Sequence, residues 1–248
     1  MKAMILAAGL GTRLRPLTDD RPKALVEVAG RTLLELTLTR LSSFGIHDVI
    51  INAHHFADMI FDYLKAHDNF GLHLEISREE ILLDTGGGLK KASWFFLEDS
   101  RAAEEPFILH NVDILSTIDL RRMVQVHTQK QALATLAVQR RESSRLLLFD
   151  DSFRLCGRRA AWDQQPEVVC PATHLQPLAF CGVHVISPQL LRMLQEEGVF
   201  SIIDSYLQLA AQGEAILGLE TDESYWRDLG KPDDLARAVR DILQGILS

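Results

Sequence analysis

A short apolar run that ends in small residues opens the chain. Residues 2–7 carry no polar side chain after the lysine, which predicts a central parallel strand covered on both faces. Ala8, Gly9 and Gly11 follow and leave little side-chain bulk above the end of this strand. Backbone N–H groups in such a loop can approach an anion closely. The start of the chain therefore predicts an anion-binding loop on a buried strand.

Basic side chains follow the small residues. Arg13 and Arg15 can make bidentate contacts and Lys23 offers a point charge, a combination suited to a polyphosphate. The glycines begin a dinucleotide-binding pattern, but its third glycine position is Leu14. No Gly-Lys-Ser/Thr follows, which also excludes a P-loop.

Strand-like and helix-like segments alternate along the rest of the chain, which predicts an α/β fold. The expected strands are residues 49–52, 72–77, 107–115, 132–139, 179–187, 215–219 and 225–227. The expected helices are residues 33–44, 57–66, 89–97, 118–130, 188–194, 202–211 and one that begins at Pro232. Thr32, three residues before Glu35, is expected to cap the first helix, and Ser116 or Thr117 the fourth.

The length of 248 residues fits one large domain, residues 1–248. The alternation weakens over residues 140–178, where 146–149 and 153–156 could form antiparallel strands around a turn. We interpret this part as an excursion that covers one side of the ligand cleft.

Charge and composition exclude several classes of function. A net charge of −8 and a pI near 5.6 argue against a nucleic-acid partner or an anionic membrane surface. The chain has no run of eighteen apolar residues and no signal-peptide pattern, so a cytoplasmic protein is expected. Cys156, Cys170 and Cys181 lack disulfide or zinc-site spacing and are expected to be small buried residues.

A second glycine-rich stretch, Asp84-Thr85-Gly86-Gly87-Gly88, precedes an expected helix. Consecutive glycines at a helix entrance permit close approach by a flat group and leave helical N–H donors free. A plain glycine-rich turn is the alternative.

Asp113 follows the apolar run that begins at Phe107. In open α/β sheets, ligands bind at the carboxyl ends of strands, so this carboxylate is well placed to hold Mg²⁺ that bridges phosphate oxygens. A helix cap or turn residue is the alternative.

The stretches GLGTRLRPLT and RPKALV, within residues 3–26, resemble the signature GxGTRLxPLT…PKxL of the sugar-phosphate nucleotidyltransferases. Residues 84–89, 109–113, 180–188 and 226–235 resemble further segments of this family in the same order. The resemblance implies a Rossmann-like three-layer α/β/α sandwich with a mixed, mostly parallel sheet, the nucleotide-diphospho-sugar transferase fold.

The resemblance also implies a reaction in which a nucleoside triphosphate and a sugar 1-phosphate give an NDP-sugar and pyrophosphate. Arg13 would hold the leaving phosphates and Lys23 the α-phosphate and the sugar phosphate, while Asp113 and Asp228 would hold Mg²⁺. The nucleotide-binding residues implied are Leu6, Ala7, Ala8, Gly9, Gly11, Thr12, Arg13, Thr85, Gly86 and Gly87. The sugar-phosphate-binding residues implied are Lys23, Asn111 and Gly182.

Two departures from the family pattern leave questions open. Val112 occupies the position of a usual glycine, and a Glu-Lys pair that meets the sugar phosphate is missing. Arg158 and Arg159 could substitute for that pair or form a solvated basic turn. The chain looks most like the compact uridylyl- and guanylyltransferases, and UTP is narrowly favoured over GTP.

Two other functions remain possible alternatives at this stage. A nucleotide-sugar-dependent glycosyltransferase also keeps a carboxylate at a strand end, but it would not need both Arg13 and Lys23 in its first loop. A catalytically silent sugar-nucleotide sensor is the other alternative. The sequence leaves the base, the sugar and the oligomeric state open.

Overall fold

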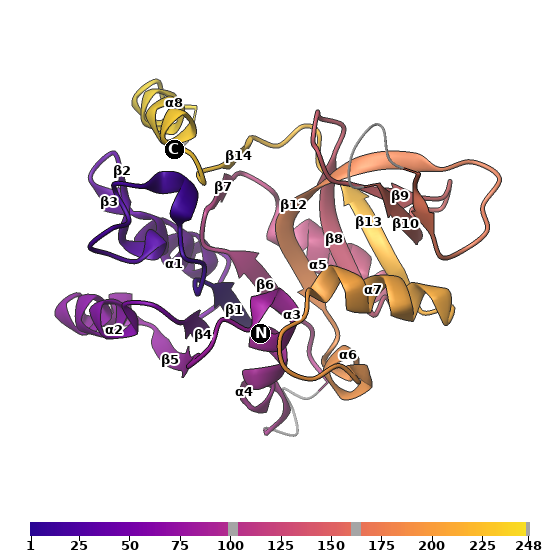
Figure 1. The fold of residues 1–248 in the computed structure, drawn as a ribbon, viewed down its shortest axis with the longest axis horizontal. Helices are drawn as coiled ribbons and strands as arrows, with labels where there is room; N and C mark the ends of the chain where they lie inside the picture. Colours follow the sequence, from indigo (N-terminus) through magenta and orange to yellow (C-terminus); the bar gives the residue numbers. More distant parts are fainter. Residues whose placement is uncertain (99–103, 160–164, 247–248) are drawn as a thin grey trace.

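The computed structural model describes residues 1–98, 104–159 and 165–246, and within these ranges ten strands form one sheet. The strands are β1 (Lys2–Leu6), β4 (Asp48–Ala53), β5 (His73–Arg78), β6 (Phe107–Asn111), β8 (Ala134–Gln139), β9 (Leu146–Phe149), β10 (Leu155–Arg159), β11 (Glu167–Val168), β12 (Gln176–Ile186) and β13 (Ile216–Glu220). They follow the order β11-β10-β9-β12-β6-β1-β4-β5, and β8 pairs with β12 and β13 (Figure 1). Short pairs outside this sheet are β2 (Glu27–Val28) with β3 (Arg31–Thr32), and β7 (Ile114–Ser116) with β14 (Trp226–Asp228).

The sheet is mixed, as the family resemblance implied. Strands β6, β1, β4 and β5 are parallel, whereas β12 runs antiparallel to β6 and β8. Leu6 at the end of β1 lies in register with Asn52 of β4 and Asn111 of β6. The carboxyl ends of these three parallel strands therefore meet at one edge, where a ligand is expected.

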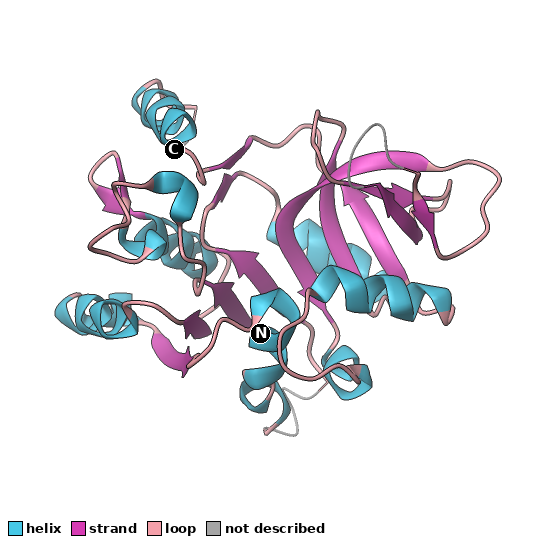
Figure 2. Cartoon of the chain, viewed as in Figure 1, coloured by secondary structure: helices cyan, strands magenta, loops and turns pink. Residues whose placement is uncertain are grey.

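Helices cover both faces of the sheet, which gives the predicted three layers (Figure 2). One core contains Ala3 and Ile5 and the apolar sides of α1 (Leu33–Ser43), α2 (Ala57–Ala66), α5 (Leu120–Gln129) and α8 (Pro232–Leu243). The other contains Met4 and the apolar sides of α3 (Asp84–Lys91), α4 (Trp94–Leu97), α6 (Pro188–Met193) and α7 (Ile202–Ala211). Alternate residues of β1 thus enter opposite cores, as the side-chain period of a doubly covered strand requires.

Local sequence signals account for most helix boundaries. The Thr32 hydroxyl accepts a hydrogen bond from the Glu35 backbone N–H at 3.0 Å, which confirms the predicted cap. The cap predicted for α5 was wrong, because this helix begins only at Leu120. Asp119 stands directly before it and accepts hydrogen bonds from the first-turn N–H groups.

The strand predicted over residues 107–115 is interrupted. Strand β6 ends at Asn111, a turn contains Val112 and Asp113, and β7 leaves the main sheet to pair with β14. An apolar run cannot reveal this break, since Ile114 and Leu115 of β7 are apolar too. The turn brings Asp113 to the edge of the sheet.

The predicted excursion contains the expected hairpin. Strands β9 and β10 are antiparallel, although the second begins later than predicted, and β9 pairs with the first part of β12. Residues 160–164 lie outside the described residues. Within the described ranges, no helix combines the length and the apolar character that crossing a bilayer requires.

Cys156 and Cys181 are buried, as predicted, and Cys170 is partly buried. Burial raises the pKa of the Cys156 and Cys181 thiols to about 11, so both are neutral at physiological pH.

Candidate active site

A cavity of about 420 Å³ lies at the carboxyl ends of β1, β4 and β6. Its walls come from the first loop, from α3 and from the turn after β6. The lining residues are Leu6, Ala7, Ala8, Gly9, Lys23, Asn52, Leu82, Asp84, Thr85, Asn111, Val112, Asp113 and Val199. The structure therefore brings together half of the ten predicted nucleotide-binding residues with Lys23, Asn111 and Asp113. The other five, which do not line this cavity, are Gly11, Thr12, Arg13, Gly86 and Gly87.

The two glycines of the first loop serve different purposes. Gly11 has a left-handed φ of 65°, and a Cβ there would meet Thr18 Cγ2 at 2.9 Å and Lys23 Cβ at 3.2 Å. Thr18 also donates its hydroxyl proton to the Gly11 carbonyl oxygen at 2.9 Å. The turn at Gly11 and this hydrogen bond together hold the loop in its folded conformation. Nothing lies within 4 Å of a Cβ placed on Gly9, which leaves open space above the backbone for a ligand.

A buried polar network supports the floor of the cavity. The Ala7 N–H donates to Asn52 Oδ1 at 2.7 Å, and Asn52 Nδ2 donates to Glu79 Oε1 at 2.7 Å. Glu79 Oε2 accepts from the Leu83 N–H at 3.0 Å. The Ala7 N–H is thus occupied rather than free for an anion, and this network was missed from the sequence. The signal available was an asparagine that ends the apolar run of β4.

Lys23 forms an ion pair with Asp113, and its ammonium donates to Asp113 Oδ2. The side chains are only 10% and 17% exposed. Lys23 begins the short 3₁₀ helix Lys23–Leu25, where the preceding proline fixes the entry of the chain. Lys23 is therefore a buried, packed residue and not a freely solvated charge of a cleft.

Asp228 lies beside the Asp113 turn because β14 pairs with β7. Asp228 is in register with Ile114, and the Leu229 N–H donates to the Asp113 carbonyl oxygen at 2.8 Å. Asp228 Oδ1 accepts from the Gly230 N–H at 2.7 Å, and Arg13 Nη2 lies 3.9 Å from Asp228 Oδ2.

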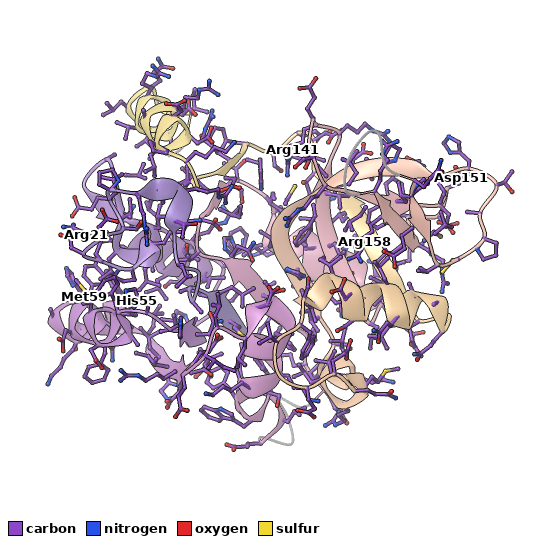
Figure 3. The ribbon with its side chains drawn as sticks, viewed as in Figure 1. Arg21, His55, Met59, Arg141, Asp151 and Arg158 are labelled. Atoms are coloured by element: carbon purple, nitrogen blue, oxygen red, sulfur yellow. The ribbon has the colours of Figure 1, made fainter. Side chains whose placement is uncertain are left out.

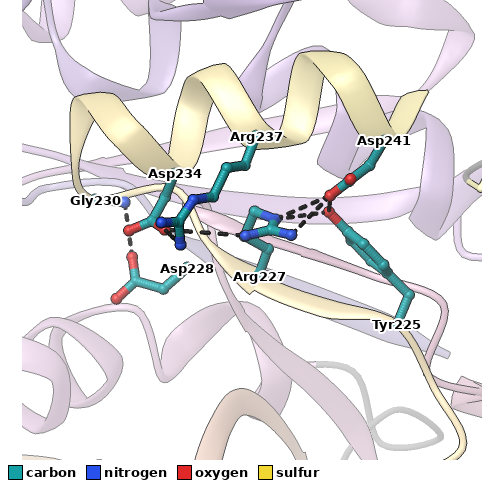
Figure 4. Close-up of polar contacts among 7 residues, drawn as sticks. All are labelled: Tyr225, Arg227, Asp228, Gly230, Asp234, Arg237 and Asp241. Carbon is teal, nitrogen blue, oxygen red and sulfur yellow. Dashed lines mark hydrogen bonds and ion pairs between the residues drawn. The ribbon is translucent and has the colours of Figure 1, made fainter. Parts of the chain in front are cut away.

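Arg227, the neighbour of Asp228, belongs to a separate cluster on α8. Figure 4 shows Arg227 directed to Asp241 and Tyr225, while Asp228 lies on the side of Gly230. This alternation follows the period of two in a strand. It leaves the Asp228 carboxylate on the side of the strand that meets Arg13.

The donor set of Asp113 and Asp228 fits a hard cation that keeps several non-protein ligands. No group of three or more His, Cys, Asp or Glu residues suited to a metal occurs in the described part of the chain. Mg²⁺ is commonly held by one or two carboxylates, with water and substrate phosphates completing its oxygen shell. Two carboxylates on hydrogen-bonded neighbouring segments match that chemistry.

The glycines predicted to precede a helix lie within α3 itself, and their contact with a nucleotide stays a prediction. The N–H groups of Gly86 and Gly87 donate to the Phe200 carbonyl oxygen at 2.9 and 3.2 Å, so they are not free. A Cβ on Gly86 would meet the Phe200 ring, and one on Gly87 would meet the Gly198 carbonyl oxygen. These glycines lie inside the helix, and their lack of side chains permits the segment between α6 and α7 to pack closely against α3. Thr85 and Asp84 remain in the cavity wall.

A second cavity, of about 650 Å³, shares Asp84, Thr85 and Asn111 with the first. It lies under the excursion and is also lined by Phe180, His184, Arg145, Arg158 and Arg159, among other residues.

Two of the expected residues, Asn111 and Gly182, lie against each other, and Asn111 lines both cavities. Gly182 has a φ of +73°, and a Cβ there would meet Asn111 Nδ2 at 2.9 Å. The predicted sugar-phosphate residues Asn111 and Gly182 are therefore neighbours.

Arg158 differs from the expectation. The side chain of Arg158 is labelled in Figure 3. Its guanidinium donates to Glu167 at 2.7 Å and also to Asp204, so two carboxylates already hold it. This geometry contradicts the idea of Arg158 as a phosphate anchor. Arg145, in the same cavity, is exposed and has no ion pair with a described residue.

Residues 2–146 match the family described as nucleotidyl transferase. The chain is 32% identical over 238 residues to N-acetylmuramate alpha-1-phosphate uridylyltransferase of Caulobacter vibrioides, which covers 93% of this chain and 92% of that protein. It is 28% identical over 248 residues to mannose-1-phosphate guanylyltransferase of Mycobacterium tuberculosis, which covers 98% of this chain and 65% of that longer protein.

Solved structures share the fold. A UDP-glucose pyrophosphorylase complexed with UDP-glucose superposes with a TM-score of 0.75 at 17% identity, covering 98% of both chains. HddC from Yersinia pseudotuberculosis complexed with GMP-PN has a TM-score of 0.75 at 20% identity, covering 97% of this chain and 99% of that one.

Proposed function

The chain belongs to the sugar-phosphate nucleotidyltransferases, which form an NDP-sugar from an NTP and a sugar 1-phosphate, and we propose that Lys23, Arg13, Asp113 and Asp228 carry this reaction. The observation that supports the proposal is the meeting of two cations and two carboxylates at the carboxyl edge of the parallel strands. A glycosyltransferase has no need of two cations at this edge.

The reaction is a displacement at the α-phosphorus. An oxygen of the sugar 1-phosphate forms a bond to this phosphorus, the bond to the bridging β-phosphate oxygen breaks, and pyrophosphate leaves with that electron pair. Both reactants are anions, so catalysis consists mainly of charge neutralisation and positioning. Lys23 supplies charge beside the α-phosphate, and Arg13 holds the departing phosphates through its paired N–H donors.

Mg²⁺ held by Asp113 and Asp228 would neutralise charge on the phosphate oxygens. The protein's own contribution is to hold the two carboxylates in place. The Leu229 N–H bonds to the Asp113 carbonyl and the Gly230 N–H to the Asp228 carboxylate. Gly230 also leaves room for Arg13, because a Cβ there would meet the guanidinium.

UTP and N-acetylmuramate 1-phosphate are the substrates that we favour. The support is the similarity to the Caulobacter uridylyltransferase over nearly the full length of both chains. The second cavity adds a physical argument, since Arg145 presents there a guanidinium that forms no ion pair with any described residue. A sugar that carries a carboxylate can bind such a group, whereas N-acetylglucosamine lacks the lactyl carboxylate of N-acetylmuramate.

Pyrophosphate release tests the proposal. UTP, GTP, CTP and dTTP are each combined with N-acetylmuramate, N-acetylglucosamine, glucose and mannose 1-phosphates in the presence of Mg²⁺. We expect the highest kcat/KM with UTP and N-acetylmuramate 1-phosphate. Release from another pair would reassign the substrates, and release from none would favour the silent sensor. Consumption of an NDP-sugar with transfer of its sugar would instead identify a glycosyltransferase.

A further inference from the structure

Arg141 is a partly buried cation that lies outside the set of residues proposed above to carry the reaction. It follows β8, and its guanidinium carbon lies 3.6 Å from the centroid of the Trp226 ring. Its Nη2 group donates to the Phe180 carbonyl oxygen at 2.7 Å. In Figure 3 the side chain lies apart from Arg158, at the end of the excursion that faces β14. Arg141 therefore joins the excursion to the segment that carries Asp228.

Trp226 directs this guanidinium toward the candidate metal ligands. Trp226 and Asp228 are two residues apart in β14, so their side chains project from the same face. The indole N–H of Trp226 donates to the Cys181 carbonyl oxygen at 2.8 Å, which fixes the ring beside Gly182. A cation stacked on this ring thus lies on the Asp228 side of the strand and near the sugar-phosphate residue Gly182.

Arg141 has unused hydrogen-bonding capacity. A guanidinium has five N–H donors, and among the described residues the Phe180 carbonyl is the only oxygen that accepts from this one. Its Nε is buried without an acceptor in the described part of the chain.

The charge of Arg141 is likewise uncompensated by a direct ion pair with any described residue. Burial lowers the pKa of Arg141, whereas the Cys181 side chain and, less strongly, the Asp228 carboxylate act in the opposite direction. The adjacent Arg140 differs, because it pairs with Glu220 at 2.7 Å and with Asp222 at 3.8 Å. A partly buried cation that forms no ion pair with a described residue is suited to a ligand anion.

We propose that Arg141 binds the phosphate of the sugar 1-phosphate and holds it against Asp228 and Gly182 for attack on the α-phosphorus. This inference rests on the proposed function. Arg13 serves the triphosphate and Lys23 lies between the two reacting phosphates, so Arg141 is the cation that binds the sugar 1-phosphate alone. The stacking on Trp226 fixes the plane of the guanidinium and thus the direction of its paired donors.

Steady-state kinetics on the full chain with Mg²⁺ test the inference, with the KM of each substrate measured at saturating concentration of the other. Arg141→Ala should raise the KM of the sugar 1-phosphate about tenfold or more, because a charged hydrogen-bonding partner is lost. The KM of the NTP should stay within about twofold. Arg141→Lys should restore part of the loss, since it keeps the charge but not the planar fork.

Arg140→Ala is the matched control, and we expect it to leave both KM values unchanged. Melting temperatures of all variants accompany the kinetics. An unchanged KM of the sugar 1-phosphate in Arg141→Ala would overturn the inference. So would equal changes in both KM values together with a lower melting temperature, which a purely structural link between the excursion and β14 predicts. Absence of pyrophosphate release by the unaltered protein would overturn the proposed function itself, and this inference with it.

Discussion

The ammonium of Lys23 and the carboxylate of Asp113 form an ion pair between segments 90 residues apart in sequence. Both side chains are largely withdrawn from water, and Lys23 also packs against the Gly11 turn. Removal of one partner from a buried pair leaves an uncompensated charge, which costs more than the pair itself contributes. The pair therefore couples the folded conformation of the first loop to the position of the Asp113 carboxylate in the turn after β6.

Lys23→Ala should lower turnover by orders of magnitude and also destabilise the fold by about 3 kcal/mol, because Asp113 loses its partner. Circular dichroism melts and pyrophosphate release measure the two effects. Arg21→Ala is the control, since Arg21 is an exposed arginine that pairs with its neighbour Asp20. The control should change neither quantity. A Lys23→Ala variant with wild-type stability would contradict the importance of the buried pair.

Asp113 and Asp228 should act as a unit toward Mg²⁺. Asp113→Asn or Asp228→Asn alone should lower kcat by about a hundredfold or more, and the double variant should lose little beyond that. The Mg²⁺ concentration for half-maximal rate, measured in all three variants, reports the shared role. Additive losses with an unchanged Mg²⁺ requirement would show that the two carboxylates act independently.

Two glycine substitutions should separate packing from ligand access. Gly87→Ala should destabilise the protein by about 1–3 kcal/mol, because its methyl group would collide with the Gly198 carbonyl. Gly9→Ala should leave stability unchanged, since nothing lies within 4 Å of the added Cβ. It should instead raise the KM of the NTP by filling space above the loop. Denaturant melts and kinetics on both variants make the comparison, and a reversed pattern would contradict it.

The positions of residues that belong to recognisable motifs could be predicted from the sequence. The first loop, Asp113 and Asp228 were expected at one edge, and the pairing of β7 with β14 places the two aspartates on neighbouring segments. The effect of Val112 at the usual glycine position could not be predicted from the sequence, because the buried Val112 side chain contributes both to the core that contains α1 and to the cavity wall.

Contacts between residues far apart in the sequence could not be predicted from the sequence. The Asn52–Glu79 network depends on the register of β4 with its neighbours, and the roles of Gly86 and Gly87 depend on where the Phe200 carbonyl lies. No local pattern encodes these positions. Arg141 was missed for the same reason, since its ring partner Trp226 lies 85 residues further along the chain (226 − 141).

Buried neutral histidines should make stability depend on pH. Burial lowers the pKa of His127 and His110 to about 4 and that of His184 to about 3. The unfolded chain therefore binds protons first as the pH falls below the ordinary value of 6.5. The stabilisation is complete above that pH and is lost toward pH 4, by about 1.4 kcal/mol per pH unit for each histidine.

The free energy of unfolding measured between pH 7 and pH 5 checks this expectation. His127 lies on α5 and bonds to Thr135 Oγ1 at 3.0 Å, so a substitution there avoids the active site. His127→Gln should reduce the slope by the contribution of one proton. An unchanged slope in this variant would mean that His127 is not the neutral, buried group described.

The fate of the α-phosphate tests the central claim most directly. UTP labelled at the α-phosphorus is incubated with the protein, Mg²⁺ and unlabelled N-acetylmuramate 1-phosphate, and the products are separated. We predict that the label appears in the UDP-sugar, with one unlabelled pyrophosphate released for each sugar consumed and none without the sugar 1-phosphate. Label that stays in UTP, or that appears as UMP whether or not the sugar phosphate is present, would contradict the account.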